Sequence, residues 1–274
     1  MTTRAERGRR PPGSRQRVVV FAGQVLIIAL IFLVWQSMSG NPQNGSPVNE
    51  FLFGKPSDIW LRFVEGIQDG SLPAAIGVTL EEALIGLAIG AGAGIVLAFA
   101  LSLTWFGRRV LAPMVFALYA VPRFVLAPYF IFVFGLGLWS KVALVGAVSF
   151  FYAFMSTFQG ALSVDAELDA VARMMQASRF QLVRTVNFPS AMIWVALSLK
   201  QATPNAFQAA IVAELLASNA GLGLVMSSSE NRFDINGVLV GTLVTTALAI
   251  LIYGLVQLAT RPLLQWRSTP DADR

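Results

Sequence analysis

Ala166–Pro189, AELDAVARMMQASRFQLVRTVNFP, is a charged segment between two long apolar runs of the sequence. Its apolar residues Leu168, Val171 and Met175 recur at steps of three and four residues, which is the period of one face of an α-helix. The segment is too polar to cross a bilayer, so this apolar face needs a partner. The partner is the chain's own helices, another protein subunit or, in the alternative interpretation, the membrane surface.

The composition is that of an integral membrane protein. Of 274 residues, 55% are hydrophobic and 13% charged, and the mean hydropathy is +0.65, which is too apolar for a soluble domain. The chain has neither Cys nor His, which excludes a disulfide framework, a thiolate nucleophile, an imidazole base and the usual zinc sites. Its basic residues sit where membrane-orientation rules place them, so a nucleic-acid partner is disfavoured.

The apolar runs predict an all-α protein with about six transmembrane helices, at 18–36, 83–103, 110–134, 142–162, 188–218 and 237–260. Residues 1–17 carry six Arg and one Glu, and we expect a disordered, basic cytoplasmic tail. The first apolar run could instead be a signal peptide. It is long for that role, and the SMSGNPQNG that follows is a poor cleavage site, so a first transmembrane helix is favoured.

Residues 37–82 are expected to form an extracytoplasmic loop. Ser, Asn, Gly and Pro are frequent at its start, and Pro56 opens an amphipathic helix that Gly70 and Pro73 should break. We expect a membrane core over 83–265, with a cytoplasmic loop at 165–187, and a cytoplasmic tail at 266–274. There is no sign of a soluble second domain.

Small residues and prolines characterise the second and third predicted spans. Gly86, Gly90 and Gly94 stand four residues apart, and this spacing favours close packing of membrane helices over a cofactor loop, which would need a preceding strand. The third span holds three prolines, which predict a broken helix packed among protein neighbours. They are Pro113, Pro122 and Pro128.

The distribution of Lys and Arg predicts the orientation. With both termini in the cytoplasm, the inner segments hold fourteen basic residues and the outer ones hold four, which are Lys55, Arg62, Lys141 and Arg232. Loops on the inner side are enriched in Lys and Arg. The charged loop at 165–187 is therefore expected to face the cytoplasm.

Three motifs resemble the permease subunits of binding-protein-dependent ABC importers. Ala170-Val171-Ala172, Gln176 and Val186-x-Phe188-Pro189 resemble their EAA loop, with Gln176 in place of the family's Gly and Ala170 in place of its acidic residue. The run VPRFVLAPYFIFVFGLGLWSKV at 121–142 resembles the nitrate, sulfonate and taurine branch. Glu214 followed by Gly221-Leu222-Gly223 resembles the family's E-x(6)-G-L-G ending.

The resemblance, which covers roughly 56–266, implies a type I permease fold and a transport role without enzymatic activity. The chain contains no G-x-x-x-x-G-K-[ST] loop, so no cofactor is expected, and ATP and Mg²⁺ would be bound by partner subunits. In this family the partners are two cytoplasmic ATPases, a second permease copy, usually identical, and an extracytoplasmic binding protein, at the bacterial inner membrane. The cytoplasmic loop would be the coupling helix that contacts the ATPase, through Leu168, Asp169, Ala170, Ala172, Arg173, Met174, Met175 and Gln176.

Polar residues within the spans are the candidates for the translocation path, because such residues usually line a cavity or pair with an opposite charge. They are Arg123, Phe124, Lys200, Gln201, Asn205, Gln208 and Glu214. Arg123 and Lys200 favour a small anionic solute such as nitrate, a sulfonate, taurine or a carboxylate. Alternatively, these two cations pair with Glu81, Glu82 or Glu214, or extend to a membrane face.

Other functions stay open at this stage. Within the same family, the solute could be a vitamin precursor of the pyrimidine or riboflavin type. An ion-coupled secondary transporter would also use broken helices, but it should show two related halves, and none is visible. A membrane enzyme would need His, Cys or clustered carboxylates in the spans.

Overall fold

The structure is a computed structural model, and it describes residues 14–40, 48–163, 174, 175, 178, 181, 185, 188–217 and 219–265. The chain divides into two units, Met1–Arg62 and Phe63–Arg274, each of which is described by itself. The described residues are helical apart from turns and two strands of two residues each, β1 (Ser39–Gly40) and β2 (Val48–Asn49), which pair in parallel. The predicted all-α class is therefore confirmed.

The first unit consists of α1 (Ser14–Met38), the two strands, α2 (Glu50–Phe53) and the beginning of α3 (Pro56–Gln68). None of the side chains in the apolar window of α1 is buried within the structure, as expected for a helix that lies in lipid. The Gln36 side chain accepts a hydrogen bond from the Ser57 backbone N–H at 3.0 Å. This bond ties the end of α1 to the first turn of α3, whose predicted start at Pro56 is confirmed.

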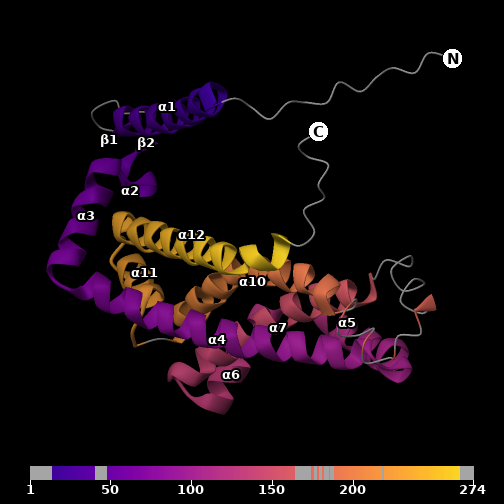
Figure 1. Cartoon of the computed structure of the whole chain (residues 1–274). Helices are drawn as coiled ribbons and strands as arrows, with labels where there is room; N and C mark the ends of the chain where they lie inside the picture. The colour runs from indigo at the N-terminus through magenta and orange to yellow at the C-terminus, as the bar shows by residue number, and fades with distance from the viewer. Residues whose placement is uncertain are drawn as a thin grey trace. The chain divides into compact units, whose positions relative to one another are not determined.

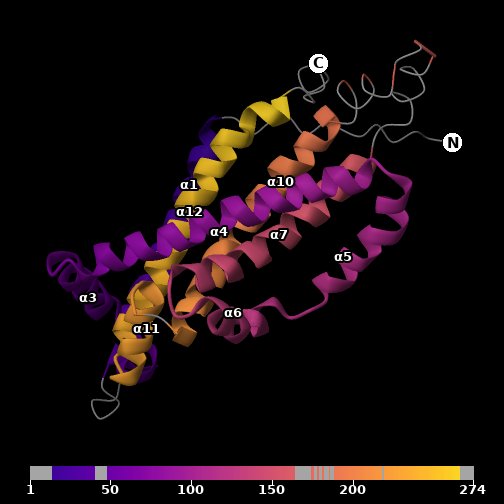
Figure 2. The same cartoon turned by 90° about the horizontal axis from the view of Figure 1, so that it is seen from below.

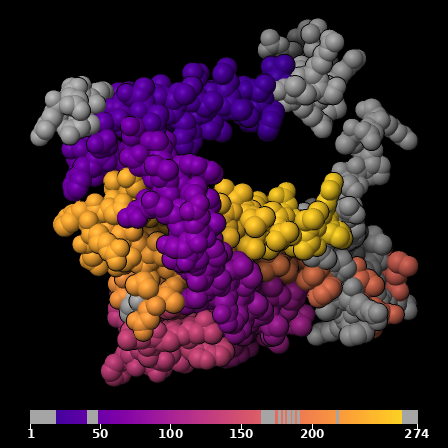
Figure 3. Space-filling view, turned by 90° about the vertical axis from the view of Figure 1, so that its left-hand side faces the viewer, coloured from indigo at the N-terminus to yellow at the C-terminus, as the bar shows by residue number. Residues whose placement is uncertain are grey.

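The second unit is a helical bundle in which α4, α7 and α10 lie side by side (Figures 1 and 2). Figure 3 shows α11 and α12, orange to yellow, as adjoining parts of one face. The elements of the second unit after α3 are α4 (Ser71–Ser102), the π-helix η2 (Gly107–Leu111), α5 (Ala112–Tyr119), the 3₁₀ helix η3 (Arg123–Leu126), α6 (Ala127–Phe134), α7 (Leu138–Leu162), α10 (Phe188–Ala217), α11 (Leu222–Asn231) and α12 (Ile235–Gln265).

Helix α4 starts earlier than the sequence predicts. Residues 71–82, expected in the extracytoplasmic loop, belong to α4. Gly70 separates α3 from α4 with φ of +78°, whereas Pro73 lies in the first turn of α4, where a missing N–H leaves no hydrogen bond unmade. The Asp69 side chain accepts the Ser71 N–H at 2.8 Å, and hydrogen bonds from Ser71 lower the pKa of Asp69 below its usual value.

Helix α7 also begins before its predicted start, at Leu138. Lys141, counted among the residues outside the membrane, therefore lies in the helix and is 4% exposed. In the orientation expected from the sequence, three basic residues then remain outside, Lys55, Arg62 and Arg232.

The predicted break in the third span is confirmed. Gly107–Tyr119 and Arg123–Phe134 form two helical pieces bent by 83°. Pro113 and Pro128 each occupy the first turn of a helix, and Pro122 precedes η3. Pro122 thus lies at the break, and Pro113 and Pro128 lie in the first turns of α5 and α6, where the fixed φ and missing N–H of proline are tolerated.

Within the described ranges, four helices are long and apolar enough to cross a membrane, or five if the bent pair is one span. They are Val19–Met38, Ser71–Ser102, Leu138–Leu162 and Ile235–Pro262. Helix α10 has 30 residues but carries Lys200, Gln201, Asn205, Gln208 and Glu214, so it is not apolar enough on composition alone. The fifth predicted span, formed by α10, stays a prediction.

Glycines set the contact between α4 and α7, as predicted. Gly86, Gly90 and Gly94 are buried against α7, and a Cβ at Gly90 would overlap the Gly146 backbone. Gly92, on another face, has no atom within 4 Å of the position a Cβ would take. The glycines thus let the two backbones approach each other more closely than larger residues would allow.

We predict that Gly90→Val disrupts this contact while Gly92→Val does not. Overlap with the Gly146 backbone forces α4 and α7 apart, and overpacking of this kind costs about 1–3 kcal/mol or more. The measurement is the thermal aggregation midpoint of the detergent-solubilised chain. Equal midpoints for the two variants would contradict the assignment of Gly90 to the helix contact.

Candidate functional site

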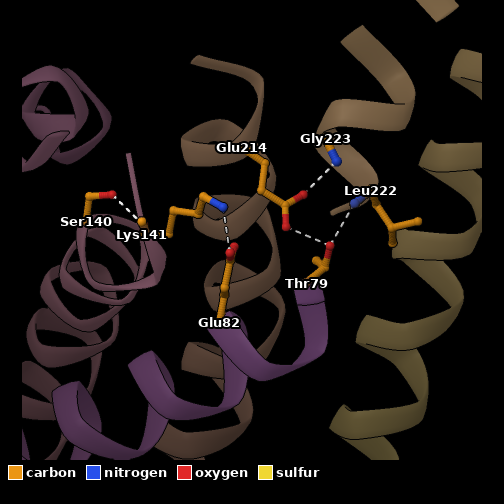
Figure 4. A network of polar contacts seen from close by, with 8 residues as sticks. Thr79, Glu82, Ser140, Lys141, Glu214, Leu222 and Gly223 are labelled. Atoms are coloured by element: carbon orange, nitrogen blue, oxygen red, sulfur yellow. Dashed lines mark hydrogen bonds and ion pairs between the residues drawn. The ribbon is translucent and has the colours of Figure 1, made fainter. Parts of the chain in front are cut away.

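A buried polar cluster joins four helices of the second unit (Figure 4). Thr79 and Glu82 come from one face of α4, Lys141 from α7 and Glu214 from α10. None of these four side chains is more than 5% exposed. Lys141 Nζ lies 2.7 Å from Glu82 Oε1, so an ion pair connects α4 with α7.

Glu214 connects α10 to both α4 and α11. Its Oε1 accepts a hydrogen bond from the Thr79 hydroxyl at 2.7 Å, and its Oε2 accepts the Gly223 N–H at 2.6 Å. The Thr79 oxygen in turn accepts the Leu222 N–H at 2.9 Å. Two N–H groups of the first turn of α11 are thereby satisfied, and a carboxylate is stabilised at a helix N-terminus.

The position of Glu214 explains the glycines seven and nine residues later. Gly221 has φ of +100°, and a Cβ there would overlap the Glu214 carboxylate. A Cβ at Gly223 would overlap the Cβ of Glu214. The turn before α11 can therefore fold over the carboxylate only because neither glycine has a side chain.

Sequence reasoning missed the role of Lys141 and Glu82. Both stand at the beginning of an apolar run, where charged residues normally mark a helix end in water. Glu82 Oε2 is buried without a hydrogen-bond partner in the part of the chain that the structure describes. Two carboxyl groups and one ammonium group share this apolar space, so the cluster depends on having all its members in place.

Arg123 lies at the break in the third span, between two tyrosines. Its guanidinium carbon is 4.4 Å from the centre of the Tyr119 ring and 5.3 Å from that of Tyr152, in cation–π range. Nη1 of Arg123 is buried and has no hydrogen-bond partner among the described residues. The next residue, Phe124, is 40% exposed.

The expected acidic partners of Arg123 and Lys200 are engaged elsewhere or exposed. Glu82 pairs with Lys141, and Glu214 bonds Thr79 and Gly223. Glu81 is exposed. The pairing alternative raised by the sequence is not seen in the described ranges.

The remaining polar candidates form a stripe along α10. Lys200 and Asn205 are half-buried, Gln201 and Gln208 are exposed, and the Asn205 amide donates to the Gln201 carbonyl at 2.8 Å. Beside Gln208, a cavity of about 260 Å³ opens between α10 and α12. It adds hydroxyl groups that the sequence reading missed, those of Thr245, Thr246 and Tyr253.

Most of the predicted coupling residues lie outside the described residues: Leu168, Asp169, Ala170, Ala172, Arg173 and Gln176. Met174 and Met175 are described, and they are 77% and 78% exposed. Further along, the Ser178 N–H donates to the Gln181 side chain at 2.8 Å, and the Gln181 N–H donates to the Ser178 hydroxyl at 3.3 Å. This reciprocal pair of hydrogen bonds has the form of a capping box.

The fold and the buried cluster define a multi-pass helical membrane protein with polar residues along one of its long helices. Residues 86–263 match the family described as "Binding-protein-dependent transport system inner membrane component". The chain belongs to this family of ABC importer permeases. It is a transport protein and not an enzyme.

Two relatives with different named solutes and one solved structure are similar to this chain. SsuC of Bacillus subtilis (strain 168), named for aliphatic sulfonates transport, is 30% identical, covering 97% of this chain and 95% of SsuC. The formylaminopyrimidine transport permease protein ThiX of Halalkalibacterium halodurans is 28% identical, covering 88% and 94%. A crystal structure of a bacterial ABC transporter involved in the import of the acidic polysaccharide alginate aligns with a TM-score of 0.58 at 15% identity, covering 90% of this chain and 97% of that one. This structure shows a shared fold.

We predict that Lys141→Met destabilises the protein strongly. Removing the ammonium leaves Glu82 buried without its partner, and breaking a buried pair in this way costs about 3–5 kcal/mol. The thermal aggregation midpoint in detergent is the measurement, and Glu81→Gln, an exposed neighbour on the same helix, is the control.

The double variant Lys141→Met with Glu82→Gln tests the cause. Once the unpaired charge is removed, the midpoint should recover most of the loss. If the double variant is no more stable than Lys141→Met alone, the ion pair is not what Lys141 contributes.

Proposed function

We propose that this chain forms the translocation path of an ATP-driven importer for a small anionic solute. Two copies of the chain would line the path, two ATPases would bind the cytoplasmic face, and an extracytoplasmic protein would deliver the solute. Both termini and the loop at 165–187 lie in the cytoplasm in this proposal, supported by the excess of basic residues in those segments.

The coupling residues are assigned to the loop between α7 and α10. The proposal gives contact with the ATPase to Leu168, Asp169, Ala170, Ala172, Arg173, Met174, Met175 and Gln176. The exposure of Met174 and Met175 supports it, because two adjacent apolar side chains on a surface suit a groove in a protein partner.

The proposal that the solute is an anion rests on the surroundings of Arg123. A guanidinium that stacks on tyrosine rings keeps its N–H groups free at the edge, and Nη1 is buried without a partner among the described residues. A planar fork of this kind binds a carboxylate or a sulfonate through two parallel hydrogen bonds. The 3₁₀ helix that begins at Arg123 contacts α10, which carries Lys200.

The polar stripe of α10 completes the proposed path. Gln201, Asn205 and Gln208 offer amide groups that replace water around a solute without binding it through charge. The cavity beside Gln208 adds the hydroxyls of α12. Glu214, also a candidate from sequence, has both carboxylate oxygens occupied by internal partners, so the proposal gives it a role in holding the helices at one end of the path.

A heterocyclic solute is the second candidate, favoured by the similarity to ThiX and by the tyrosines at the break. The anionic solute is preferred because Arg123 already covers the Tyr119 ring at 4.4 Å, which leaves less aromatic face for a flat ligand. A secondary transporter is disfavoured by membership of the importer family.

We predict that Arg123→Gln lowers uptake of the anionic solute at least about tenfold, because a charge-assisted pair is worth about 1.5–3 kcal/mol. Arg123→Lys keeps the charge but loses the planar fork, so its uptake should lie between that of the wild type and that of Arg123→Gln. The measurement is uptake of radiolabelled alkanesulfonate, taurine and formylaminopyrimidine into proteoliposomes containing the whole transporter. Unchanged anion uptake in Arg123→Gln, at equal protein levels, would refute the role of Arg123.

We predict that changing Met174 and Met175 together to Asp abolishes co-purification of the ATPase subunits encoded beside this chain. Two acids in an apolar groove would be desolvated without partners. Phe233→Asp is the matched control, since Phe233 is 76% exposed and lies between α11 and α12, at the opposite end of α10 from the methionines. Normal ATPase binding by the methionine variant would place the docking surface elsewhere.

A further inference from the structure

A second and larger cavity, of about 560 Å³, lies between the end of α4 and the beginning of α10. Eight of its lining residues are apolar, and Val96 of α4 and Met192 of α10 lie on its two sides. The Phe99 and Phe188 rings stack across it at 5.5 Å between centroids. Its volume falls within the roughly 300–1,000 Å³ typical of small-molecule pockets, but its lining is too apolar for a soluble metabolite.

One charged side chain, Arg108, lines this cavity. The turn that carries it is closely built, because the Gly107 N–H donates to the Thr104 hydroxyl at 3.0 Å and the Arg108 N–H donates to the Thr104 carbonyl at 3.1 Å. Gly107 is buried, and a Cβ there would overlap the Leu101 carbonyl. This geometry fixes Arg108 at the cavity, where it is exposed.

No acidic residue lines the cavity, and Arg108 has no carboxylate partner in the described part of the chain. The other polar lining residue is Ser102, whose hydroxyl already donates to the Phe99 carbonyl at 2.8 Å. The cavity therefore combines a long apolar interior with one free positive charge. That combination matches an amphiphile with an acyl chain and an anionic head.

We propose that this cavity binds an anionic phospholipid, with an acyl chain between α4 and α10 and the phosphate on Arg108. The site lies at the end of α4 where basic residues accumulate, and basic pockets between membrane helices bind the headgroups of anionic lipids. The acyl chain packs on the stacked rings of Phe99 and Phe188. The inference requires only that the chain lies in a membrane and is independent of the transported solute.

The experiment measures lipid retention by the full chain. The protein is purified in a mild detergent, incubated with equal amounts of phosphatidylglycerol and phosphatidylcholine, and the bound lipid is counted by native mass spectrometry. The wild type should retain one phosphatidylglycerol per chain in preference to phosphatidylcholine. Arg108→Gln should reduce this preference about fivefold, the worth of one basic residue near anionic lipid.

Two variants make the test specific. Arg109→Gln removes an equal charge from the neighbouring residue, which is exposed and does not line the cavity, and it should retain lipid as the wild type does. Met192→Trp fills the cavity and should lose both lipids.

Three results would overturn the proposal: equal retention by Arg108→Gln and the wild type, an equal loss in Arg109→Gln, or unchanged retention in Met192→Trp. None of these measurements involves transport, so a negative result for the lipid proposal can be distinguished from a negative result for the proposed function.

Discussion

The close contact of α4 with α7 constrains the rest of the membrane core. Glu82, Gly86, Gly90 and Gly94 are spaced four residues apart, so they form one stripe along α4. The glycines bring the backbones together, and the ion pair from Glu82 to Lys141 closes the same contact one turn beyond them. A buried ion pair adds little net stability, but it is costly to break, so it fixes the position of α7 along α4.

The faces of helix α10 differ in composition and in what they contact. Ala202, Ala206, Ala209 and Ala213 pack against the core formed with α4 and α7, where their small side chains permit close approach. The amides of Gln201 and Gln208 lie on the exposed side. The surroundings of these residues therefore separate their roles: Glu214 accepts hydrogen bonds on both carboxylate oxygens inside the bundle, whereas the amides of Gln201 and Gln208 are open to whatever lies beside α10.

The sequence was sufficient for features that depend on local chemistry. Proline restricts the backbone wherever it stands, so the break in the third span was predictable, and four-residue glycine spacing indicated a packed helix face. The buried role of Lys141 and Glu82 was not predictable, because a charge beside an apolar run looks the same whether it ends a helix or pairs with a residue 59 positions away. The start of α4 was missed for a related reason, since Pro73 breaks a helix only beyond its first turn.

The contacts of α7 with α4 and with α5 differ in how much displacement they tolerate. Along α4, sliding would bring a residue with a side chain against the Gly146 backbone, where only Gly90 leaves room, and would separate a charged pair. By contrast, α5 meets α7 through aromatic rings, Phe116 with Phe154 and Phe158, and Tyr119 with Phe151 and Tyr152. Ring contacts are less directional than hydrogen bonds and can be remade at another offset.

Displacement of α5, the first part of the bent span, is therefore less costly than displacement of α4 against α7. An importer that alternates between outward and inward access needs one part of each subunit to stay rigid while another moves. In the proposed importer, the glycine contact and the Glu82–Lys141 pair would supply the rigid part, and the 83° bend before Arg123 marks where the chain changes direction. Arg123 stands at that joint and stacks on a ring from each side, Tyr119 of the bent span and Tyr152 of α7. A solute anion bound to Arg123 would thus act on the contact between the rigid and the displaceable parts, which is where binding has the most influence on the conformation.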